Sequence, residues 1–474
     1  MSVLDYVVIA GYLAAITAFG SWFARFQKTT RDYFLTDRSI PWWAVCFTIV
    51  ATETSTLSFI GVPASAFAGN MTFLQLAMGY VIGRVIISLL FVPAYFRGDL
   101  FTSYELLQRR FGSPVKTLAA GIFLVTRTLA DGVRLFATAL VIAVVTGIPV
   151  SWTVLILGTA MIVYTARGGV SAVIWTDVVQ MFVYLAGAIA VFLALLGRIP
   201  GGWDDVVRAG ESAGKFVVLN WSTDPKLTYT LWAGLLGGAT LTLATHGTDQ
   251  YLVQRLLSAR SPRDASLGLV LSGVVVFAQF VLFLIIGVML FAYYQHTPLP
   301  PLGRPDEILP RFVVTSLSGG VAGFIVAAIV AAALSPSLNA MAATTVNDFY
   351  RQYVRPDADE PTLMRVSRFS TIVWGVLQIG VALAAQGMDR SVLDAGLLVL
   401  SLATGPVLGA FLMGVLTRRV DARAMMAGMS AGIVVLGVLW WTGAVAWTWY
   451  ACIGAAVTCS VALAAWKALP KSGV

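Results

Sequence analysis

The feature that most constrains this chain is a series of apolar segments separated by short polar loops. A helix needs about 20 apolar residues to cross a bilayer, and we count about 13 such segments in the 474 residues. Because a helix satisfies its backbone hydrogen bonds internally, the segments predict an all-α polytopic membrane protein rather than a β-barrel. Their approximate limits are 3–23, 41–67, 73–96, 116–146, 151–166, 174–197, 229–251, 269–294, 314–345, 366–386, 392–416, 424–442 and 446–466.

The basic residues of the chain gather in alternate loops between these segments. The net charge of +8 therefore does not indicate nucleic-acid binding. Cytoplasmic loops of membrane proteins carry such an excess of Lys and Arg. We predict a multi-pass protein of the plasma (inner) membrane, with the N-terminus outside and the C-terminus in the cytoplasm. The basic loops include Arg25–Arg38, Arg97–Lys116, Arg255–Arg263, Arg351–Arg368 and Arg418–Arg423.

Two of the apolar segments contain interruptions. Segment 41–67 turns polar from Thr52 to Thr56, and segment 229–251 contains three glycines followed by threonines and His246. Interrupted helices at matching positions of two halves indicate a transporter built from inverted repeats. The alternative is that the hydroxyls bond back to their own helices and the glycines serve helix packing. We predict one transmembrane domain over 1–474, with repeats at 41–197 and 229–416 and peripheral helices and a tail at 1–40 and 417–474.

A charged cluster lies inside the fourth apolar segment. Arg127, Asp131 and Arg134 are spaced at i, i+4 and i+7, which places them on one helix face. Charges at bilayer depth are costly and usually face a polar cavity. The cluster therefore predicts that something polar passes through the membrane beside it. The alternative is a self-contained ion network that stabilises its own helix.

Several motifs resemble those of one transporter family. The chain is similar to the sodium:solute symporter family from about Tyr6 to Trp466, and within it to the branch of bacterial sialic acid, iodide and multivitamin transporters. The resemblance implies the inverted-repeat fold of the leucine transporter, with ten core helices and extra helices at the edges. It is carried by Phe59-Ile60-Gly61-Val62-Pro63, Gly168-Gly169-Val170-Ser171, Trp175-Thr176-Asp177, Asp249-Gln250-Tyr251, Gln254-Arg255 and Leu338-Asn339-Ala340.

The resemblance also implies positions for sodium. At the first site the ligands would be the carbonyls of Ala51 and Thr54 and hydroxyls from segment 314–345. There the chain departs from the family pattern, because one alignment matches Ser335 to the first hydroxyl and the other places Ala332 in the hydroxyl pair. Some members have a second site, where Asp177 would supply the carboxylate and Ser335 and Ser337 would add oxygens, which suit a hard cation. The alternative role for Asp177 is a solvated helix N-cap.

A substrate site is implied as well. In the sialic acid branch an Arg of the third core helix pairs with the substrate carboxylate, and Arg134 lies at or next to that position. Ala77 stands where the branch has Gln, and Glu53 where it has Thr. For His246 and Gln279 an interhelical hydrogen bond is an alternative role. The predicted substrate residues are Glu53, Ser55, Ser58, Phe73, Ala77, Asp131, Arg134, His246 and Gln279.

Glu53 lies between the two expected carbonyl ligands. Its carboxylate could bind substrate, replace a missing sodium ligand, or carry a proton if burial favours its neutral form. The structural alternative is a Glu that bonds free amides of the broken helix. An intramembrane carboxylate is costly to keep for structure alone.

These observations predict a secondary symporter that moves a small polar solute, such as an organic anion or a sugar, inward with sodium. The alternatives are a proton-coupled symporter that uses Glu53 and a non-transporting solute sensor. We expect no enzyme, no nucleic-acid partner and no cofactor besides the sodium ion. The chain has no metal-ligand motif and only three cysteines, all in apolar segments. The partners would be the solute, the cation and the lipid bilayer, with the monomer as the functional unit.

Overall fold

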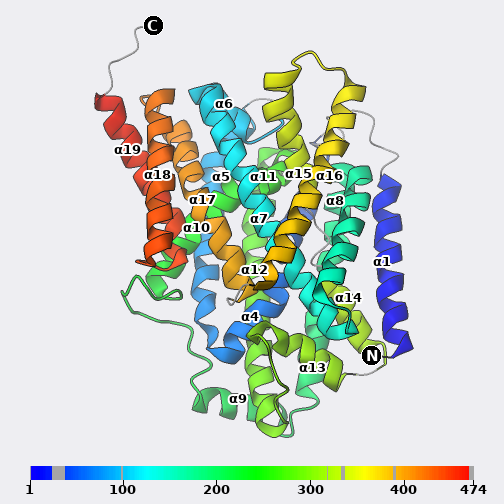
Figure 1. The fold of residues 1–474 in the computed structure, drawn as a ribbon. Helices are drawn as coiled ribbons and strands as arrows, with labels where there is room; N and C mark the ends of the chain where they lie inside the picture. The colour runs from blue at the N-terminus through cyan, green and yellow to red at the C-terminus, as the bar shows by residue number, and fades with distance from the viewer. Residues whose placement is uncertain are drawn as a thin grey trace.

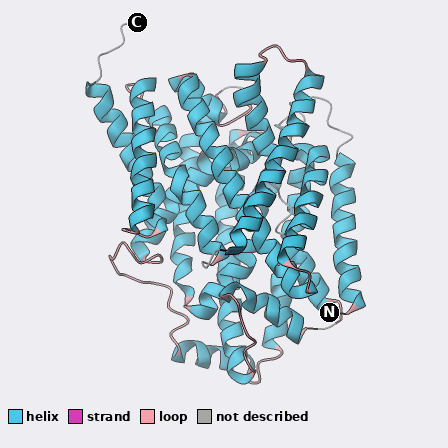
Figure 2. Ribbon diagram, in the orientation of Figure 1, coloured by secondary structure: helices cyan, strands magenta, loops and turns pink. Residues whose placement is uncertain are grey.

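The computed structural model is a bundle of helices along its described length, and no β-strand is drawn there (Figure 2). The structure describes residues 2–23, 38–97, 100–317, 319–331, 337–387 and 391–468. The all-α prediction is confirmed. The longer helices are α1 Val3–Phe23, α3 Trp42–Glu53, α4 Thr56–Ala68, α5 Leu74–Tyr95, α7 Ser113–Thr146, α8 Val150–Leu196, α10 Gly238–Gly247, α12 Pro262–His296, α14 Val321–Ala331, α16 Glu360–Ala384, α17 Val392–Leu416, α18 Ala422–Thr442 and α19 Tyr450–Ala468.

Shorter helices connect and cap these elements. Two of them, α6 and α9, lie at opposite ends of the bundle in Figure 1. They are η3 Met71–Phe73, α6 Tyr104–Phe111, α9 Gly202–Ser212, η4 Ala233–Gly237, α11 Gln250–Leu257, η5 Pro305–Glu307, α13 Ile308–Ser316, α15 Leu338–Thr344, η6 Thr345–Val354, η7 Ala385–Gly387 and η8 Trp447–Trp449.

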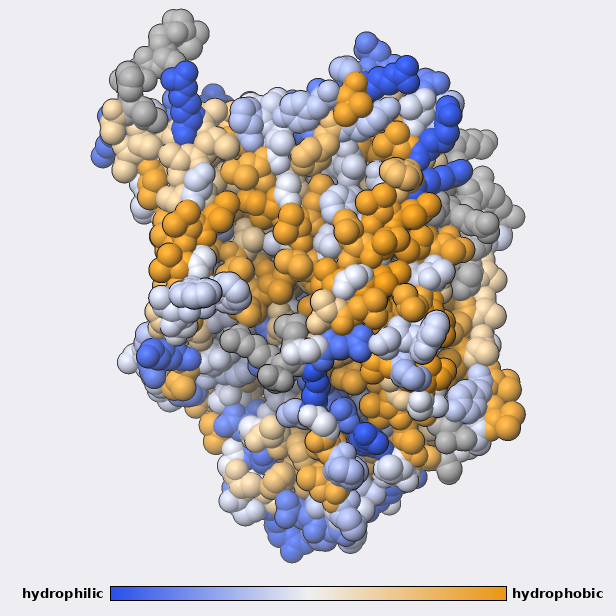
Figure 3. Space-filling view, in the orientation of Figure 1, coloured by the Kyte–Doolittle hydropathy of each residue, from blue (hydrophilic) through white to orange (hydrophobic). Residues whose placement is uncertain are grey.

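Nine helices of the described residues are long and apolar enough to cross a membrane, or ten if α3 and α4 count as one bent span. Apolar side chains cover most of the middle of the visible face, and hydrophilic ones gather mainly toward its two ends (Figure 3). The expected number of 13 separate spans is not confirmed. Segments 151–166 and 174–197 lie in the single helix α8, and segments 229–251 and 314–345 are divided among shorter helices.

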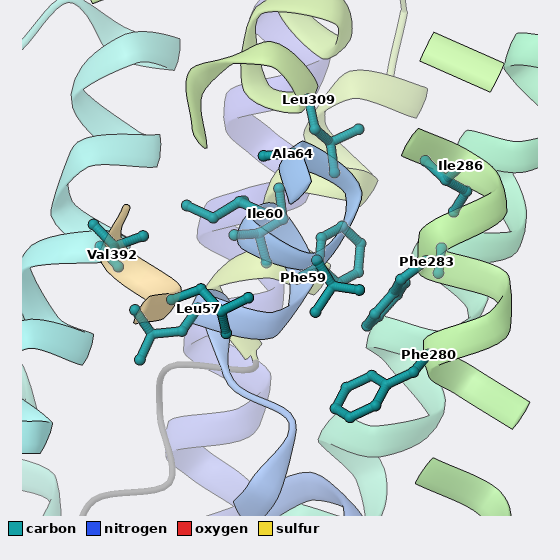
Figure 4. Packing of buried hydrophobic residues seen from close by; sticks show 14 of the residues in the cluster. Leu57, Phe59, Ile60, Ala64, Phe280, Phe283, Ile286, Leu309 and Val392 are labelled. Carbon is teal, nitrogen blue, oxygen red and sulfur yellow. The ribbon is translucent and has the colours of Figure 1, made fainter. Parts of the chain in front are cut away.

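The polar run in segment 41–67 breaks the helix. Between α3 and α4, Thr54 and Ser55 have extended backbones, and the two helices are bent by 63°. Ser and Thr hydroxyls compete with the helix for backbone partners, which favours a break at this run. The predicted interruption is therefore confirmed. Figure 4 shows α4 beyond the break, with Phe59 on the side that faces Phe283 of α12; the two ring centroids are 5.3 Å apart.

Segment 229–251 is interrupted as well. It begins as a π-helical turn at η4, continues as α10 and ends at Gly247, before Asp249 caps α11 by accepting a hydrogen bond from the Tyr251 amide. Its glycines also serve close packing. A Cβ on Gly79 of α5 would lie 2.2 Å from the carbonyl oxygen of Gly234. The sequence left open whether this segment is interrupted or whether its glycines only serve helix packing. The structure shows both features.

The broken helix occupies the centre of the bundle. Helix α4 packs against α12, α17 and α7, whereas α1 lies at one edge and α18 and α19 lie at the other (Figure 1). Helix α1 begins near one end of the bundle and α19 ends at the opposite one. This placement is consistent with an odd number of crossings between them.

Candidate functional site

A cavity lies beside the break between α3 and α4. Its polar lining includes Thr52, Glu53, Arg127, Arg134 and His246, contributed by α3, α7 and α10. Apolar side chains complete the walls, among them Phe73, Tyr80, Leu241, Phe280 and Leu393. Buried charges are retained in proteins only when they are paired or hydrogen-bonded. Each polar group of this lining therefore needs a partner in the protein or in a ligand.

Arg127 is the most completely bonded cation of the cavity. Its Nη2 contacts the carboxylate of Asp249, the N-cap of α11, and its guanidinium lies 4.7 Å from the ring centroid of Tyr251. Its Nη1 lies 3.7 Å from Asp131, whose other oxygen accepts a hydrogen bond from Ser337 of the segment before α15. The cluster predicted on one helix face is therefore not self-contained, because it joins α7 to α11 and α15.

Arg134 is much less completely bonded. Its Nη2 lies 3.4 Å from the carbonyl oxygen of Thr52, and its Nη1 lies 3.8 Å from Asp131. Its Nε is buried and has no partner among the described residues, as is also true of Arg84 and Arg127, so the difference lies in the long contacts of its two Nη atoms. The side chain remains 13% exposed toward the cavity. Arg134 therefore has hydrogen-bond donors available for a ligand.

Glu53 bonds a third cation rather than free backbone amides. Its Oε2 contacts the guanidinium of Arg84 on α5, whose Nη1 donates to Ser272 of α12 at 2.9 Å. The ring of His246 completes the group, with Nε2 3.2 Å from Arg84. The sequence interpretation missed Arg84. The available signal was an Arg inside the apolar segment 73–96, since an intramembrane cation implies a partner.

Asp177 of α8 also has a cationic partner. Its Oδ2 accepts hydrogen bonds from Thr48 of α3 at 2.7 Å and from Arg255 of α11 at 2.9 Å, with Thr52 at 3.3 Å. Its Oδ1 is buried and has no partner among the described residues. The alternative of a solvated N-cap is wrong, because Asp177 is fully buried within α8.

The predicted first sodium site is only partly described. Ala51 and Thr54 lie at the end of α3 and in the break, as the prediction requires. Helix α14 approaches this break, because the hydroxyl of Thr56 donates to the carbonyl of Ile329 at 3.1 Å. Ala332 and Ser335 lie outside the described residues, so their role as ligands stays a prediction.

The other predicted substrate residues divide into two groups. Ser58 and Phe73 line the cavity together with Glu53, Arg134 and His246. Among the described residues, the cavity lining does not include the remaining four, although all are buried. These are Ser55, the N-cap of α4, Ala77 of α5, Asp131 of α7, and Gln279 of α12, whose Oε1 accepts a hydrogen bond from Tyr184.

A separate charged cluster lies past the end of segment 314–345, at the end of the bundle that also holds α6. Asp348 of η6 is fully buried, and its Oδ1 lies 3.1 Å from Lys116 and 3.0 Å from the hydroxyl of Thr102. Burial raises the pKa of Asp348 to about 7, although the ammonium of Lys116 opposes this rise. Glu105 lies nearby, and burial raises its pKa as well.

A membrane-spanning bundle with a span broken beside a charged cavity defines a secondary transporter. Sequence comparison gives its family, since the model of the sodium:solute symporter family matches residues 33–432. The chain belongs to this family, and the resemblance seen in its motifs is confirmed.

Individual relatives agree with this assignment. The chain is 31% identical to the sodium/sialic acid symporter NanT of Aliivibrio fischeri, covering 92% of this chain and 87% of that one. It is 30% identical to the human sodium/iodide cotransporter, covering 91% and 68%. The fold matches a substrate-bound, outward-open Na+-coupled sialic acid symporter with a TM-score of 0.90, at 26% identity over 99% and 98% of the two chains.

The chain is therefore a sodium-coupled solute symporter of the membrane, and not an enzyme. Its partners are a solute and sodium ions. The relatives favour neither of the two alternatives raised by the sequence, a proton-coupled symporter and a solute sensor. The substrate-binding and sodium-binding residues named above stay predictions.

Proposed function

We propose that this symporter imports a small organic anion together with sodium, and that Arg134 binds the acid group of the solute. The observation that carries the proposal is the incomplete bonding of Arg134 inside the cavity. A guanidinium has five N–H donors and binds a carboxylate through two parallel hydrogen bonds. An anion in the cavity would supply the acceptors that Arg134 lacks.

The relatives support an anionic solute. The bacterial relative is named for sialic acid and the human relative for iodide, and both solutes are anions. The chemistry around Arg134 is consistent with the same charge, because Arg127 is already bonded to Asp249 and Arg84 to Glu53. Ser58 and Phe73 would contact the remainder of the solute, and His246 and Glu53 its polar groups.

We infer that sodium binds on the other side of the broken helix. The carbonyls of Ala51 and Thr54 would be ligands, with Ser335, or under the other alignment the backbone at Ala332, completing the first site. Asp177 and Ser337 would serve a second site. Oxygen ligands of this kind suit a hard monovalent cation. The approach of α14 to the break supports the first site, because it brings the segment before 332 beside Thr56.

The proposed organisation follows the inverted repeats predicted from the sequence, at 41–197 and 229–416. The helices of 1–40 and 417–474 would be peripheral, and the functional unit would be the monomer. The breaks at Thr54–Ser55 and at Thr248 support the pairing of α3–α4 with α10–α11. We place the N-terminus outside and the C-terminus in the cytoplasm from the basic loops, so that an inward sodium gradient would drive import.

Uptake by reconstituted protein tests the proposal. Proteoliposomes with an imposed sodium gradient would be offered a panel of radiolabelled organic anions, matched neutral amides and sugars. We expect uptake of an anion, and its loss in Arg134→Ala, because removing one partner of a buried charge pair costs about 2–5 kcal/mol, or about 30-fold or more in affinity. Arg134→Lys should restore part of it.

The control is Arg208→Ala, since Arg208 is 75% exposed on α9 and pairs only with Asp205 among the described residues. Uptake of sugars or amides with no uptake of any anion would contradict the proposal. So would wild-type anion affinity in Arg134→Ala, and so would uptake driven by a pH gradient without sodium.

A further inference from the structure

In the group formed by Glu53, Arg84 and His246, both Arg84 and His246 approach the same carboxylate oxygen, Oε2 of Glu53. An Arg can only donate, so in the tautomer that hydrogen-bonds Arg84, the His246 Nε2 that lies 3.2 Å away accepts. Nδ1 of His246 then carries the proton and donates to Thr245 Oγ1 at 2.9 Å, and that hydroxyl donates to the carbonyl of Leu241 at 2.9 Å. In that tautomer His246 is neutral, and the group combines one cation with one anion.

Glu53 retains an acceptor that this group does not use. Arg84 and His246 both approach Oε2, whereas Oε1 accepts no hydrogen bond from the described residues. The side chain of Glu53 is 12% exposed, and it lines the cavity, whereas that of Arg84 is completely enclosed. Arg84 thus holds the carboxylate and compensates its charge from the side that faces away from the cavity. One carboxylate oxygen remains available to a solute.

This acceptor and the donors of Arg134 line the same cavity. The guanidinium of Arg134 reaches the carbonyl of Thr52, the residue immediately before Glu53. No ion pair joins Arg134 to Glu53 in the part of the chain that the structure describes, so the two groups face the same cavity without neutralising each other. A solute with an acid group next to a hydrogen-bond donor would bind both residues, the acid group at Arg134 and the donor at Glu53.

Arg84 determines whether a charged or an uncharged donor of the solute is favoured at Glu53. A solute ammonium at Glu53 would lie near a carboxylate whose charge is already compensated, and between the cations Arg84 and Arg134. A hydroxyl group would make the same hydrogen bond without this repulsion. We propose that Glu53, held and neutralised by Arg84, accepts a hydrogen bond from an uncharged hydroxyl next to the acid group, so that the transporter selects 2-hydroxy acids over 2-amino acids and unsubstituted acids.

This inference rests on the proposed binding of an acid group by Arg134. Its test uses probes with the same carbon skeleton, namely 2-hydroxypropanoate, alanine and propanoate, with the corresponding four-carbon and six-carbon sets. Each is measured by thermal shift of the purified protein in sodium and by competition for uptake. We expect the wild type to prefer the hydroxy acid over both others by about tenfold or more, because a buried acceptor that loses water and gains no donor weakens binding.

Substitution of Arg84 gives the decisive readout. In Arg84→Gln the carboxylate of Glu53 is no longer compensated, so we expect the preference to move from the hydroxy acid to the amino acid. Arg84→Lys should keep the wild-type order. The double variant Glu53→Gln with Arg84→Gln removes both charges of this pair, and because Arg134 remains, it should not show the shift to the amino acid that is expected of Arg84→Gln.

The outcomes separate this inference from the function on which it rests. Equal binding of all three probes by the wild type, or an unchanged order in Arg84→Gln, would overturn the role of Glu53 and Arg84 while anion binding at Arg134 stands. Failure of every acid in every set would overturn the anion proposal itself, and this inference with it.

Discussion

The carboxylate of Asp177 on α8 is held by the guanidinium of Arg255 on α11, with 2.9 Å between Oδ2 and Nη2. The sequence predicts that Asp177 is a sodium ligand. In the structure its carboxylate is already paired with the guanidinium of Arg255. Thr48 of α3 bonds the same oxygen, so three helices meet at this carboxylate. A sodium ion at the predicted second site would share Asp177 with Arg255.

Asp177→Asn is expected to raise the sodium concentration needed for half-maximal uptake, because the amide is a weaker ligand for a hard cation than a carboxylate. It should also lower the free energy of unfolding by roughly 3–5 kcal/mol, since Arg255 loses the carboxylate of a buried ion pair. Sodium-dependent uptake and thermal unfolding measure the two effects separately.

Asp205→Asn is the matched control for this variant. Asp205 forms an ion pair with the exposed Arg208, and exposed pairs contribute about 0–1 kcal/mol. If Asp177→Asn is less stable but keeps the wild-type sodium dependence, Asp177 only joins helices and the second sodium site is elsewhere.

Protein stability is expected to depend on pH through Asp348. The pKa of this carboxyl is about 7 in the folded protein against an ordinary value of 3.8. A raised folded-state pKa adds stability at low pH, and that stability is lost as the pH rises through the folded pKa. Wild type should therefore lose stability, relative to Asp348→Asn, between about pH 4 and pH 7.

Thermal unfolding of purified protein at pH 5 and pH 8 measures this difference, and Asp357→Asn at an exposed position of the loop after η6 is the control. Asp348 is surrounded by Lys116 of α7, Thr102 and the carboxylate of Glu105 of α6. An identical pH dependence in wild type and Asp348→Asn would show that another group is responsible.

Gly79→Ala is expected to destabilise the contact between α5 and α10. The added Cβ would lie 2.2 Å from the carbonyl oxygen of Gly234 and 2.8 Å from the amide nitrogen of Ala239, both of which are backbone atoms. Overpacking of this kind typically costs about 1–3 kcal/mol. Unfolding of the purified variant in detergent would measure the loss.

Gly380→Ala on α16 is the comparison, because a Cβ there meets no atom within 4 Å and the backbone is helical. Replacing an unpacked helical glycine should leave stability unchanged or raise it by about 0.5–1 kcal/mol. Equal stabilities of the two variants would mean that α5 and α10 separate easily at this contact.

The sequence by itself determined that the chain is a helical membrane protein with a break near Thr54, because apolar length and local hydroxyl chemistry act over a few neighbouring residues. It also determined the family, through motifs such as Trp175-Thr176-Asp177. It did not determine the number of spans. Polar or glycine-rich stretches of similar composition can end a helix, as at Gly247, or lie inside a continuous one, as in α8.

Only the tertiary structure decided the partners of the buried charges. Glu53 lies 31 residues from Arg84 and 193 from His246, and Asp177 lies 78 residues from Arg255. Spacing along one helix predicts which charges share a face, and it correctly placed Arg127, Asp131 and Arg134 together. Which cation compensates which carboxylate depends on how helices distant in the sequence pack, because a buried charge is stabilised by whatever opposite charge the fold brings within contact.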